Sequence, residues 1–470
     1  MYNSILQFAI DLTKKICERA ESGEIRDLDL MAEAVLSDCK ETSILVMSEL
    51  IREMNERIRG DNQYRKELGL IIKEKDRPRS LLTVLGQIDF SRDYFYDKQD
   101  GHCTCVLDQM LGIAKYERIG AAVGAALVTE AAKTSYARAS EIVTNGIVSR
   151  QTVHNQILKV NVPEVRPKEE KREVKELHIY ADEDHAHMQK PGKKKGKKCQ
   201  VIPLVTVTEG MYQESKRRNR TINPMHFADE GFNTKRLWKA VEGYIEKAYD
   251  LERIETVYIH GDGGPWIKNG LEDIAQTAHV IDGYHFMRDL RSICRILPRR
   301  NIRVTLLWAL ENDDRERAHR YIQELLGETL SEKDLKRIKD FAGRLFRFWE
   351  EIRRRLTEAI PGSCTEGQVS HVLSERFSRD PLGWSQKPLG KLVGVRVFWK
   401  NGGKLTKDDF RKDTVQTERY SAYADRLVEE HLKGAADFSL FEPEDPIFDT
   451  ASGTQQLIRG LGRTRNTLFQ

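Results

Sequence analysis

Apolar and polar positions change their spacing several times after residue 176, and the spacing predicts strands and helices in a definite order. Apolar residues alternate with polar ones in ELHIYADEDHAHMQ, which is typical of a strand, whereas TKRLWKAVEGYIEKAY repeats them every three or four residues, as an amphipathic helix does. The predicted elements are strands at Leu177–Gln189, Cys199–Val207 and Asn223–Ala228, a helix at Thr234–Tyr249, a strand at Glu255–His260, a helix at Trp266–Gln276 and a strand at Ala278–Ile281.

The chain on either side of this region is mostly helical in its periodicity. Residues 1–78 repeat apolar positions at helical spacing and close with a polar break, KEKDRPR. The next segment, SLLTVLGQIDFSRDYFYD, predicts a β-hairpin with Gly86 near its turn. Residues 286–360 are helical and rich in arginine, and a shorter helix follows before an irregular tail that begins at Pro381.

A helix-turn-helix is predicted at 136–159. Tyr136–Val143 forms its first helix, Thr144–Gly146 the turn, and Ser149 the N-cap of a second helix with the sequence RQTVHNQILK. The polar face of that second helix suits a DNA major groove and consists of Arg150, Gln151, His154, Asn155 and Lys159. An ordinary helical hairpin with a solvated face is the alternative.

Length and composition describe a soluble protein of several domains. The 470 residues are 39% hydrophobic and 32% charged, and no apolar run approaches the roughly 20 residues that span a bilayer. Without a secretory pattern at the N-terminus, we expect a cytoplasmic, nucleoid-associated protein. Seven cysteines give no disulfide framework. The expected segments are helical 1–78, mixed 79–162, a charged linker 163–176, an α/β core 177–285, a helical insertion 286–360, a short helix 361–380 and a tail 381–470.

Three acidic residues stand in settings that favour metal-dependent chemistry. Asp182 lies on the first predicted strand, Asp262 follows a later strand in HGDGGPWI, and Glu366 opens the helix EGQVSHVLSERF. Converging carboxylates suit a pair of Mg²⁺ or Mn²⁺ ions about 4 Å apart, which clamp the two oxygens of a phosphoryl transfer. Each acid also has a plain structural explanation: a solvated strand end for Asp182, a helix cap for Asp262, and a favourable helix-dipole contact for Glu366.

Two neighbouring acids complicate the assignment. Strand alternation turns Asp184 to the same face as Asp182, so Asp184 is an alternative or a helper. Glu375 lies nine residues after Glu366, which places it on the opposite face of one helix and excludes a shared site.

Basic residues cluster around the predicted sheet although the net charge is only +4. His285 either packs on a helix that Asp282 caps or contacts a phosphate. The next residues of that helix place Arg288, Arg291 and Arg295 in one stripe, followed by Arg299, Arg300 and Arg303. Further groups are Lys193, Lys194, Lys195, Lys197 and Lys198 in one strand connection and Lys216, Arg217, Arg218 and Arg220 in the next. Together they predict double-stranded DNA as the partner.

The order of three strands, helix, strand, helix and strand is that of a ribonuclease-H-like core. The chain also resembles the ISLre-type bacterial insertion-sequence transposases, long catalogued as an uncharacterised protein family and related to Mutator-like DDE transposases. The resemblance covers most of the chain and rests on TVLGQIDFSRDYFY, SRQTVHNQI, YADEDH, HGDGGPWI, DGYHF and EGQVSHVLSERFSRDPLGW.

The resemblance implies a DDE transposase. Asp182, Asp262 and Glu366 would be its catalytic, metal-binding acids, and terminal-inverted-repeat DNA and target DNA its substrates. It further implies a helical insertion before the glutamate and action as a homodimer or higher multimer on DNA. The alternatives are a catalytically silent DNA-binding protein, such as a domesticated repressor, and a structure-specific nuclease on the same fold.

Overall fold

The computed structural model describes residues 2–21, 27–164, 167, 170–189, 198–215, 218–271, 274, 276–362, 364–380 and 382–410. These residues form two compact units, which we treat separately. The first contains the described residues up to Ser80 together with Ile88–Glu117, and the second contains Leu81–Gln87 and the described residues from Arg118 onward. Among the described residues, no helix combines the length and the apolar character needed to cross a membrane.

The first unit joins helices to a small antiparallel sheet. Asp93, fully buried in a strand, accepts hydrogen bonds from Arg59 Nε at 2.7 Å and from Asn55 Nδ2 at 3.2 Å, which fastens the long second helix to the sheet. The elements are helices α1 (Tyr2–Glu21), α2 (Leu28–Gly60), α3 (Asn62–Glu67) and α4 (Val106–Met110), and strands β1 (Leu70–Thr83), β2 (Gly86–Asp97) and β3 (His102–Thr104), in the sheet order β1-β2-β3.

The predicted hairpin around Gly86 is confirmed, but the prediction of a polar break before it is wrong. Residues 73–79 lie inside β1, and the helical region therefore ends at Glu67 rather than at residue 78. Strand β1 is at the edge of its sheet and is largely exposed, so it carries charged side chains and tolerates Pro78. A run of charged residues is typical of a loop, but it also occurs on an exposed edge strand such as this one.

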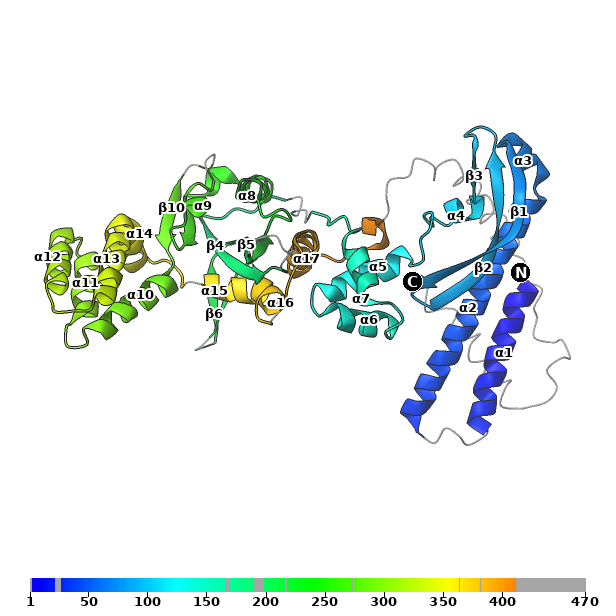
Figure 1. Ribbon diagram of the computed structural model, residues 1–470, viewed down its shortest axis with the longest axis horizontal. Helices are drawn as coiled ribbons and strands as arrows, with labels where there is room; N and C mark the ends of the chain where they lie inside the picture. Colours follow the sequence, from blue (N-terminus) through cyan, green and yellow to red (C-terminus); the bar gives the residue numbers. More distant parts are fainter. Residues whose placement is uncertain are drawn as a thin grey trace. The chain divides into compact units, whose positions relative to one another are not determined.

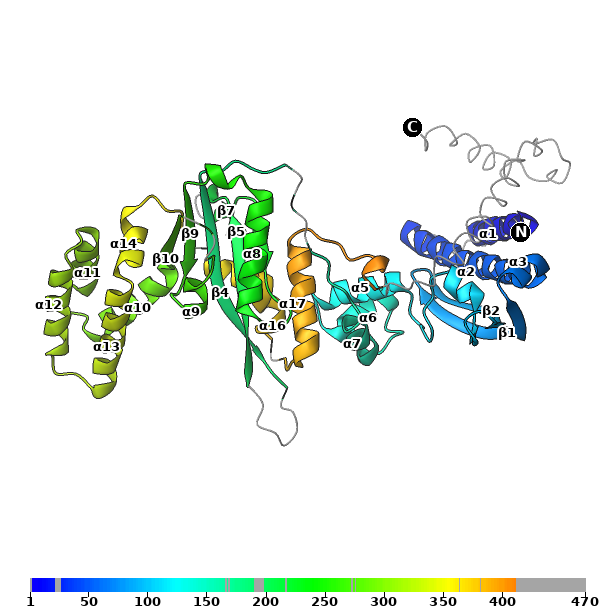
Figure 2. The same cartoon turned by 90° about the horizontal axis from the view of Figure 1, so that it is seen from above.

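The second unit is built on a mixed five-stranded sheet, which lies left of the centre in Figures 1 and 2. Its strands are β4 (Glu176–His187), β5 (Cys199–Thr208), β8 (Met225–Phe227), β9 (Thr256–Gly261) and β10 (Thr277–Ile281). The order is β10-β9-β4-β5-β8, with β4 parallel to β9 and antiparallel to β5. All five predicted strands are confirmed, whereas the small ribbon of β6 (Met211–Ser215) and β7 (Arg218–Thr221) was not predicted.

Helix α8 (Thr234–Ala248) covers one face of the sheet. Its residues Leu237 and Val241 pack with Leu177 and Ile179 of β4 in one apolar cluster. The next predicted helix, residues 266–276, is much shorter: α9 spans only Pro265–Lys268. Within the predicted span, Leu271 and Gln276 adopt positive φ angles of 56° and 70°, which an α-helix does not contain.

The arginine-rich region is helical, as predicted. Five helices follow β10 and have an apolar core of their own, which includes Leu290, Leu306 and Leu345. They occupy the left of Figure 1 and are α10 (Gly283–Ile296), α11 (Ile302–Glu311), α12 (Arg315–Leu326), α13 (Glu332–Arg347) and α14 (Trp349–Thr357). The chain then returns to the sheet through α15 (Thr365–Val369), a π-helical turn η2 (Ser370–Ser374) and α16 (Glu375–Phe377).

The prediction of an irregular tail from Pro381 is wrong for the part that forms helix α17 (Gln386–Lys400). Leu389, Leu392 and Val393 of this helix are fully buried, so it belongs to the core. Its glycines made the segment resemble a loop, but Gly390 is needed for packing, because a Cβ there would lie 1.9 Å from the carbonyl oxygen of Glu230. Residues 411–470 of the predicted tail lie outside the described residues.

The predicted helix-turn-helix is present as secondary structure. It comprises α6 (Tyr136–Thr144) and α7 (Arg150–Ile157), preceded by α5 (Ala121–Ala131). Ser149 caps α7 by accepting a hydrogen bond from the Thr152 backbone N–H at 3.1 Å, and Asn145 ends α6 with a φ of 49°. The buried side of these helices shares one apolar cluster with η2, α16 and α17.

Candidate metal centre

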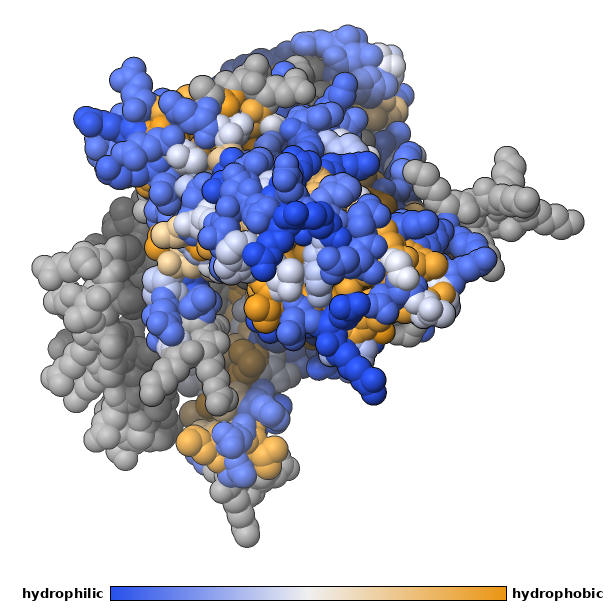
Figure 3. Space-filling view, turned by 90° about the vertical axis from the view of Figure 1, so that its left-hand side faces the viewer, coloured by the Kyte–Doolittle hydropathy of each residue, from blue (hydrophilic) through white to orange (hydrophobic). Residues whose placement is uncertain are grey.

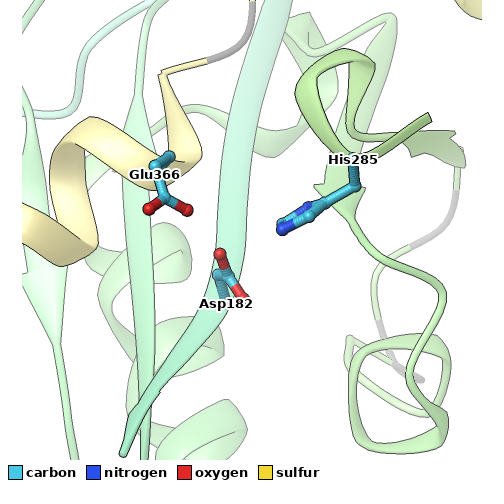
Figure 4. Close-up of side chains that lie close together, drawn as sticks. All are labelled: Asp182, His285 and Glu366. Carbon is cyan, nitrogen blue, oxygen red and sulfur yellow. The ribbon is translucent and has the colours of Figure 1, made fainter. Parts of the chain in front are cut away.

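Three side chains from distant parts of the sequence converge beside the central strand of the five-stranded sheet, where its pairing with β9 ends. Asp182 comes from β4, His285 from the first turn of α10, and Glu366 from the first turn of α15 (Figure 4). One ligand atom from each lies within 4.8 Å of the other two. Two carboxylates and an imidazole at this spacing form a set of donors for one divalent cation.

The strand register explains the position of Asp182. The parallel pairing of β4 with β9 ends where Tyr180 faces His260, and Asp182 lies two residues further along β4. Asp262 lies two residues beyond His260, so both aspartates follow the end of this pairing on the same side of the sheet. Beyond that point β4 continues with β5 alone, as far as His187.

His285 is positioned by the cap of its helix. Asp282 follows β10, and its backbone N–H donates to the Gly261 carbonyl oxygen at 2.8 Å. The Oδ1 atom of Asp282 then accepts hydrogen bonds from the backbone N–H groups of Tyr284 and His285, at 2.8 and 3.2 Å. The capping role predicted for Asp282 is therefore confirmed, and it fixes the helix turn that carries the imidazole.

Burial raises the pKa of Asp182 to about 6. A backbone hydrogen bond from Glu183 and the nearby His285 lower the pKa, whereas the charges of Asp262 and Asp282 raise it further. A partly buried carboxylate beside two other acids is costly to ionise, and a bound cation would remove that cost.

The environment of the His285 ring is a second observation that favours a divalent cation at this site. The Nδ1 atom of His285 has no hydrogen-bond partner among the described residues, although it lies 3.6 Å from Asp282 Oδ1. A ligating histidine usually has its second ring nitrogen next to a carboxylate, which fixes the ring and raises its basicity. His285, expected at most to contact phosphate, thus joins the group of ligand atoms.

Asp262 lies near this group without belonging to it. Its side chain is exposed, and its Oδ1 accepts a hydrogen bond from the Gly264 backbone N–H at 2.9 Å, which forms the turn before α9. Gly263 between them has a φ of 85°. The glycine-rich turn is therefore present, but the cap predicted as an alternative for Asp262 is not, because Gly264 is the N-cap of α9 and no side chain caps this helix. The charge of Asp262 also acts on Asp182.

Asp184 has a different role from Asp182. Its Oδ1 accepts hydrogen bonds from Ser374 Oγ at 3.1 Å and Ser378 Oγ at 2.7 Å, and the side chain is buried. Asp184 thus fastens β4 to η2 and α16, the segment that continues from Glu366. Neither serine was predicted from the sequence, where the spacing of four residues between Ser374 and Ser378 is the only sign that both could face the same partner.

Glu375 is directed away from the centre. It lies 2.9 Å from Arg396 and 3.1 Å from His371, so it takes part in a separate ion-pair group. This agrees with the prediction that Glu375 and Glu366 do not share a site, although the intervening turn is π-helical and not α-helical.

The residues predicted to contact DNA are mostly accessible. On α7, Arg150, Gln151 and Asn155 are exposed and His154 is half-buried. On α10, Arg288, Arg291 and Arg295 are exposed on the stripe that begins near His285. Figure 3 views the side of the protein where α10–α14 lie and shows mainly hydrophilic residues there. Lys193, Lys194, Lys195, Lys197, Lys216 and Arg217 lie outside the described residues.

Comparison with known proteins places this chain among bacterial relatives. A UPF0236 protein of Caldanaerobacter subterraneus subsp. tengcongensis is 35% identical over 391 residues, or 82% of this chain and 80% of that protein. A second UPF0236 protein of the same bacterium is 33% identical over 438 residues, or 92% and 90% of the two chains.

Among solved structures, the chain is similar to one titled Drosophila P element transposase strand transfer complex, with 10% identity over 74% of this chain and 92% of that one. The TM-score of 0.21 is too low to support any argument. The model of the uncharacterised protein family UPF0236 matches residues 24–414. With most of its length matched by that model and by relatives above 30% identity, the chain belongs to the UPF0236 family.

Proposed function

We propose that this protein is a DDE-type transposase that cuts and joins DNA at the ends of an insertion sequence. The observation that carries the proposal is the convergence of Asp182, His285 and Glu366 beside the central strand of a mixed five-stranded sheet. Asp262 is close enough for its charge to act on Asp182. Acids on a strand, after a strand and on a helix are the arrangement that ribonuclease-H-like transposases use.

The sheet supports a ribonuclease-H-like core. Strand β4 is central. Its antiparallel neighbour β5 lies on one side and pairs in turn with β8, which is antiparallel to β5, and the parallel strands β9 and β10 lie on the other side. This is the topology expected from the order of three strands, helix, strand, helix and strand. The five helices between β10 and Glu366 then correspond to an insertion before the catalytic glutamate.

The residues of the centre suit phosphoryl transfer with water or a DNA 3′-hydroxyl as nucleophile. Asp182, His285 and Glu366 would hold a divalent cation, Mg²⁺ or Mn²⁺, which polarises a phosphate oxygen and favours deprotonation of the attacking group. Asp262 and Asp182 offer carboxylates for a second ion. The exposed arginines of α10 would bind the DNA backbone next to the reacting phosphate. No covalent intermediate with the protein is required.

The relatives are also in keeping with a mobile element. Several of them carry names that join many loci of one Caldanaerobacter genome under a single protein, up to eleven in the first. Multiple copies of one coding sequence in one genome are the expected product of transposition.

The test is cleavage of a labelled duplex that carries the DNA flanking the gene, with Mg²⁺, with Mn²⁺ or with chelator. We expect a metal-dependent nick at the element boundary by the wild type and by Glu358→Gln, a control carboxylate. Glu366→Gln should bind the same DNA without cutting it.

Other outcomes would point elsewhere. Sequence-specific binding by the wild type without any cut would favour a silent DNA-binding protein. Cutting of branched DNA without end preference, and without joining of strands, would favour a structure-specific nuclease.

A further inference from the structure

One buried arginine connects the helix-turn-helix region to the segment that carries Glu366. Arg396 lies on α17, and only 3% of its surface is exposed. Its guanidinium donates hydrogen bonds to the Ala132 carbonyl oxygen at 2.9 Å, to the His371 carbonyl oxygen at 3.0 Å and to the Val372 carbonyl oxygen. It also contacts the Glu375 carboxylate at 2.9 Å.

The carbonyl groups that Arg396 contacts need such a donor. Ala132 is the C-cap of α5, where the last carbonyls of a helix have no partner within the helix. His371 and Val372 lie in the π-helical turn η2, where the regular α-helical hydrogen-bond pattern is interrupted. The planar guanidinium, with five donors in fixed directions, can satisfy both groups at once, which a lysine cannot do.

A second buried arginine repeats this connection. Arg376, on α16, donates from Nε to the Ala131 carbonyl oxygen at 2.9 Å, next to the carbonyl that Arg396 contacts. Its guanidinium also lies over the Trp384 ring, 4.6 Å from the centroid. Two arginines therefore hold the end of α5 against the segment that follows Glu366.

The opposite side of this segment is fastened to the sheet. Asp184 of β4 accepts the hydroxyl hydrogen bonds of Ser374 and Ser378, two residues along the strand from Asp182. The segment 365–378 is therefore held between the strand that carries Asp182 and the helices that precede α7. The common apolar cluster of these elements fills the space between the polar contacts.

We propose that Arg396 is a positioning residue that makes α5–α7 and the helix of Glu366 one rigid body. DNA bound by α7 would then be presented to the metal centre at a fixed distance, and the position of the cut would follow from the bound sequence. The proposal rests on the proposed function for its role in cutting, but the rigid connection itself is measurable without any reaction.

Hydrogen exchange followed by mass spectrometry tests the connection in the full chain. In Arg396→Lys we expect exchange at least tenfold faster than in the wild type, both in α5–α7 and in residues 365–378, with α8 and β9 unchanged. The matched control is Arg236→Lys. Arg236 lies on α8 and forms an ion pair with Asp229 at 2.8 Å. Faster exchange in only one of the two regions, or equally everywhere, would overturn the proposal.

The cutting assay then tests the consequence. With the labelled duplex, Arg396→Lys should bind DNA within twofold of the wild type, cut at least tenfold more slowly, and spread its cuts over several neighbouring phosphates. If Arg396 only stabilises the fold, the variant should still cut at a single phosphate. Slower cutting at that one phosphate would therefore overturn the positioning role. If Arg396→Lys does not fold, Glu375→Gln removes one partner of the guanidinium and should show the same changes to a smaller extent.

The two proposals fail in different ways. If the wild type cuts no DNA with either metal ion, the proposed function fails, while the exchange comparison still decides whether Arg396 connects the two regions. If the wild type cuts and the variant matches it in exchange and cut position, only the role of Arg396 fails.

Discussion

Replacing Asp182 by asparagine should stabilise the protein in the absence of metal. Burial, followed by the charges of Asp262 and Asp282, brings the pKa of Asp182 to about 6, compared with an ordinary value of 3.8. Because the folded-state pKa is raised, the protonated carboxyl is favoured in the fold. Its contribution to stability is present below about pH 4 and is lost as the pH rises through about 6.

The size of the effect follows from the shift. Two pKa units correspond to at most about 3 kcal/mol, and the partial exposure of the site reduces this to about 1–2 kcal/mol. Asparagine keeps the oxygen that accepts the Glu183 backbone N–H at 2.9 Å and has nearly the same volume. The variant should therefore gain about 1–2 kcal/mol in unfolding free energy at pH 7.5 and nothing at pH 4.

Urea unfolding with a chelator, at pH 4 and at pH 7.5, measures this difference. Asp229→Asn is the control with the opposite sign. Burial opposes ionisation of Asp229, but hydrogen bonds from Arg236 and from backbone N–H groups still lower its pKa, so this variant should lose stability at pH 7.5. A loss of stability in Asp182→Asn at pH 7.5, or a gain of equal size at pH 4, would refute the reasoning.

Three other outcomes are expected. His285→Ala should lose at least tenfold in Mn²⁺ affinity by calorimetry, and unchanged affinity would remove the imidazole from the centre. His178 and His260 lie 3.2 Å apart, and burial lowers both pKa values, that of His178 to about 4. In Asp182→Asn, which removes the opposite contribution of Asp182, stability should therefore fall from pH 6.5 toward 4, and a flat profile would contradict this. Gly390→Ala should cost more than about 2 kcal/mol in thermal unfolding, because its Cβ would meet a backbone oxygen. Gly243→Ala on α8, with open space around it, should cost nothing, and equal losses would refute the packing argument.

The sheet could be predicted because its periodicity is local. The sequence patterns of β4 and β9 predict strands. In their parallel register Tyr180 pairs with His260, so Asp182 and Asp262 each lie two residues beyond the last pair. The cap at Asp282 was also visible in the sequence, since an aspartate before a helix has a known geometry.

The remaining features depend on distant contacts. Nothing near His285 in the sequence shows that its ring lies within 4.8 Å of the Glu366 carboxylate, because the rest of α10 and four further helices separate the two residues. The same holds for Asp184, whose partners lie 190 and 194 residues away. Helix α17 was hidden by its glycines, which serve close packing against the Glu230 backbone and not chain flexibility.

The π-helical turn between Glu366 and Ser374 makes the number of residues in this segment as important as their identity. Each residue added to or removed from a helix rotates everything beyond it by about 100°. A deletion within Ser370–Ser374 that turns the π-helical turn into regular helix would leave the later serine near its present direction. A deletion within the regular turn at 367–369 would instead rotate that serine away from Asp184, although every acid of the centre is kept. Single-residue deletions at 367–369 should therefore be as damaging as the loss of a ligand.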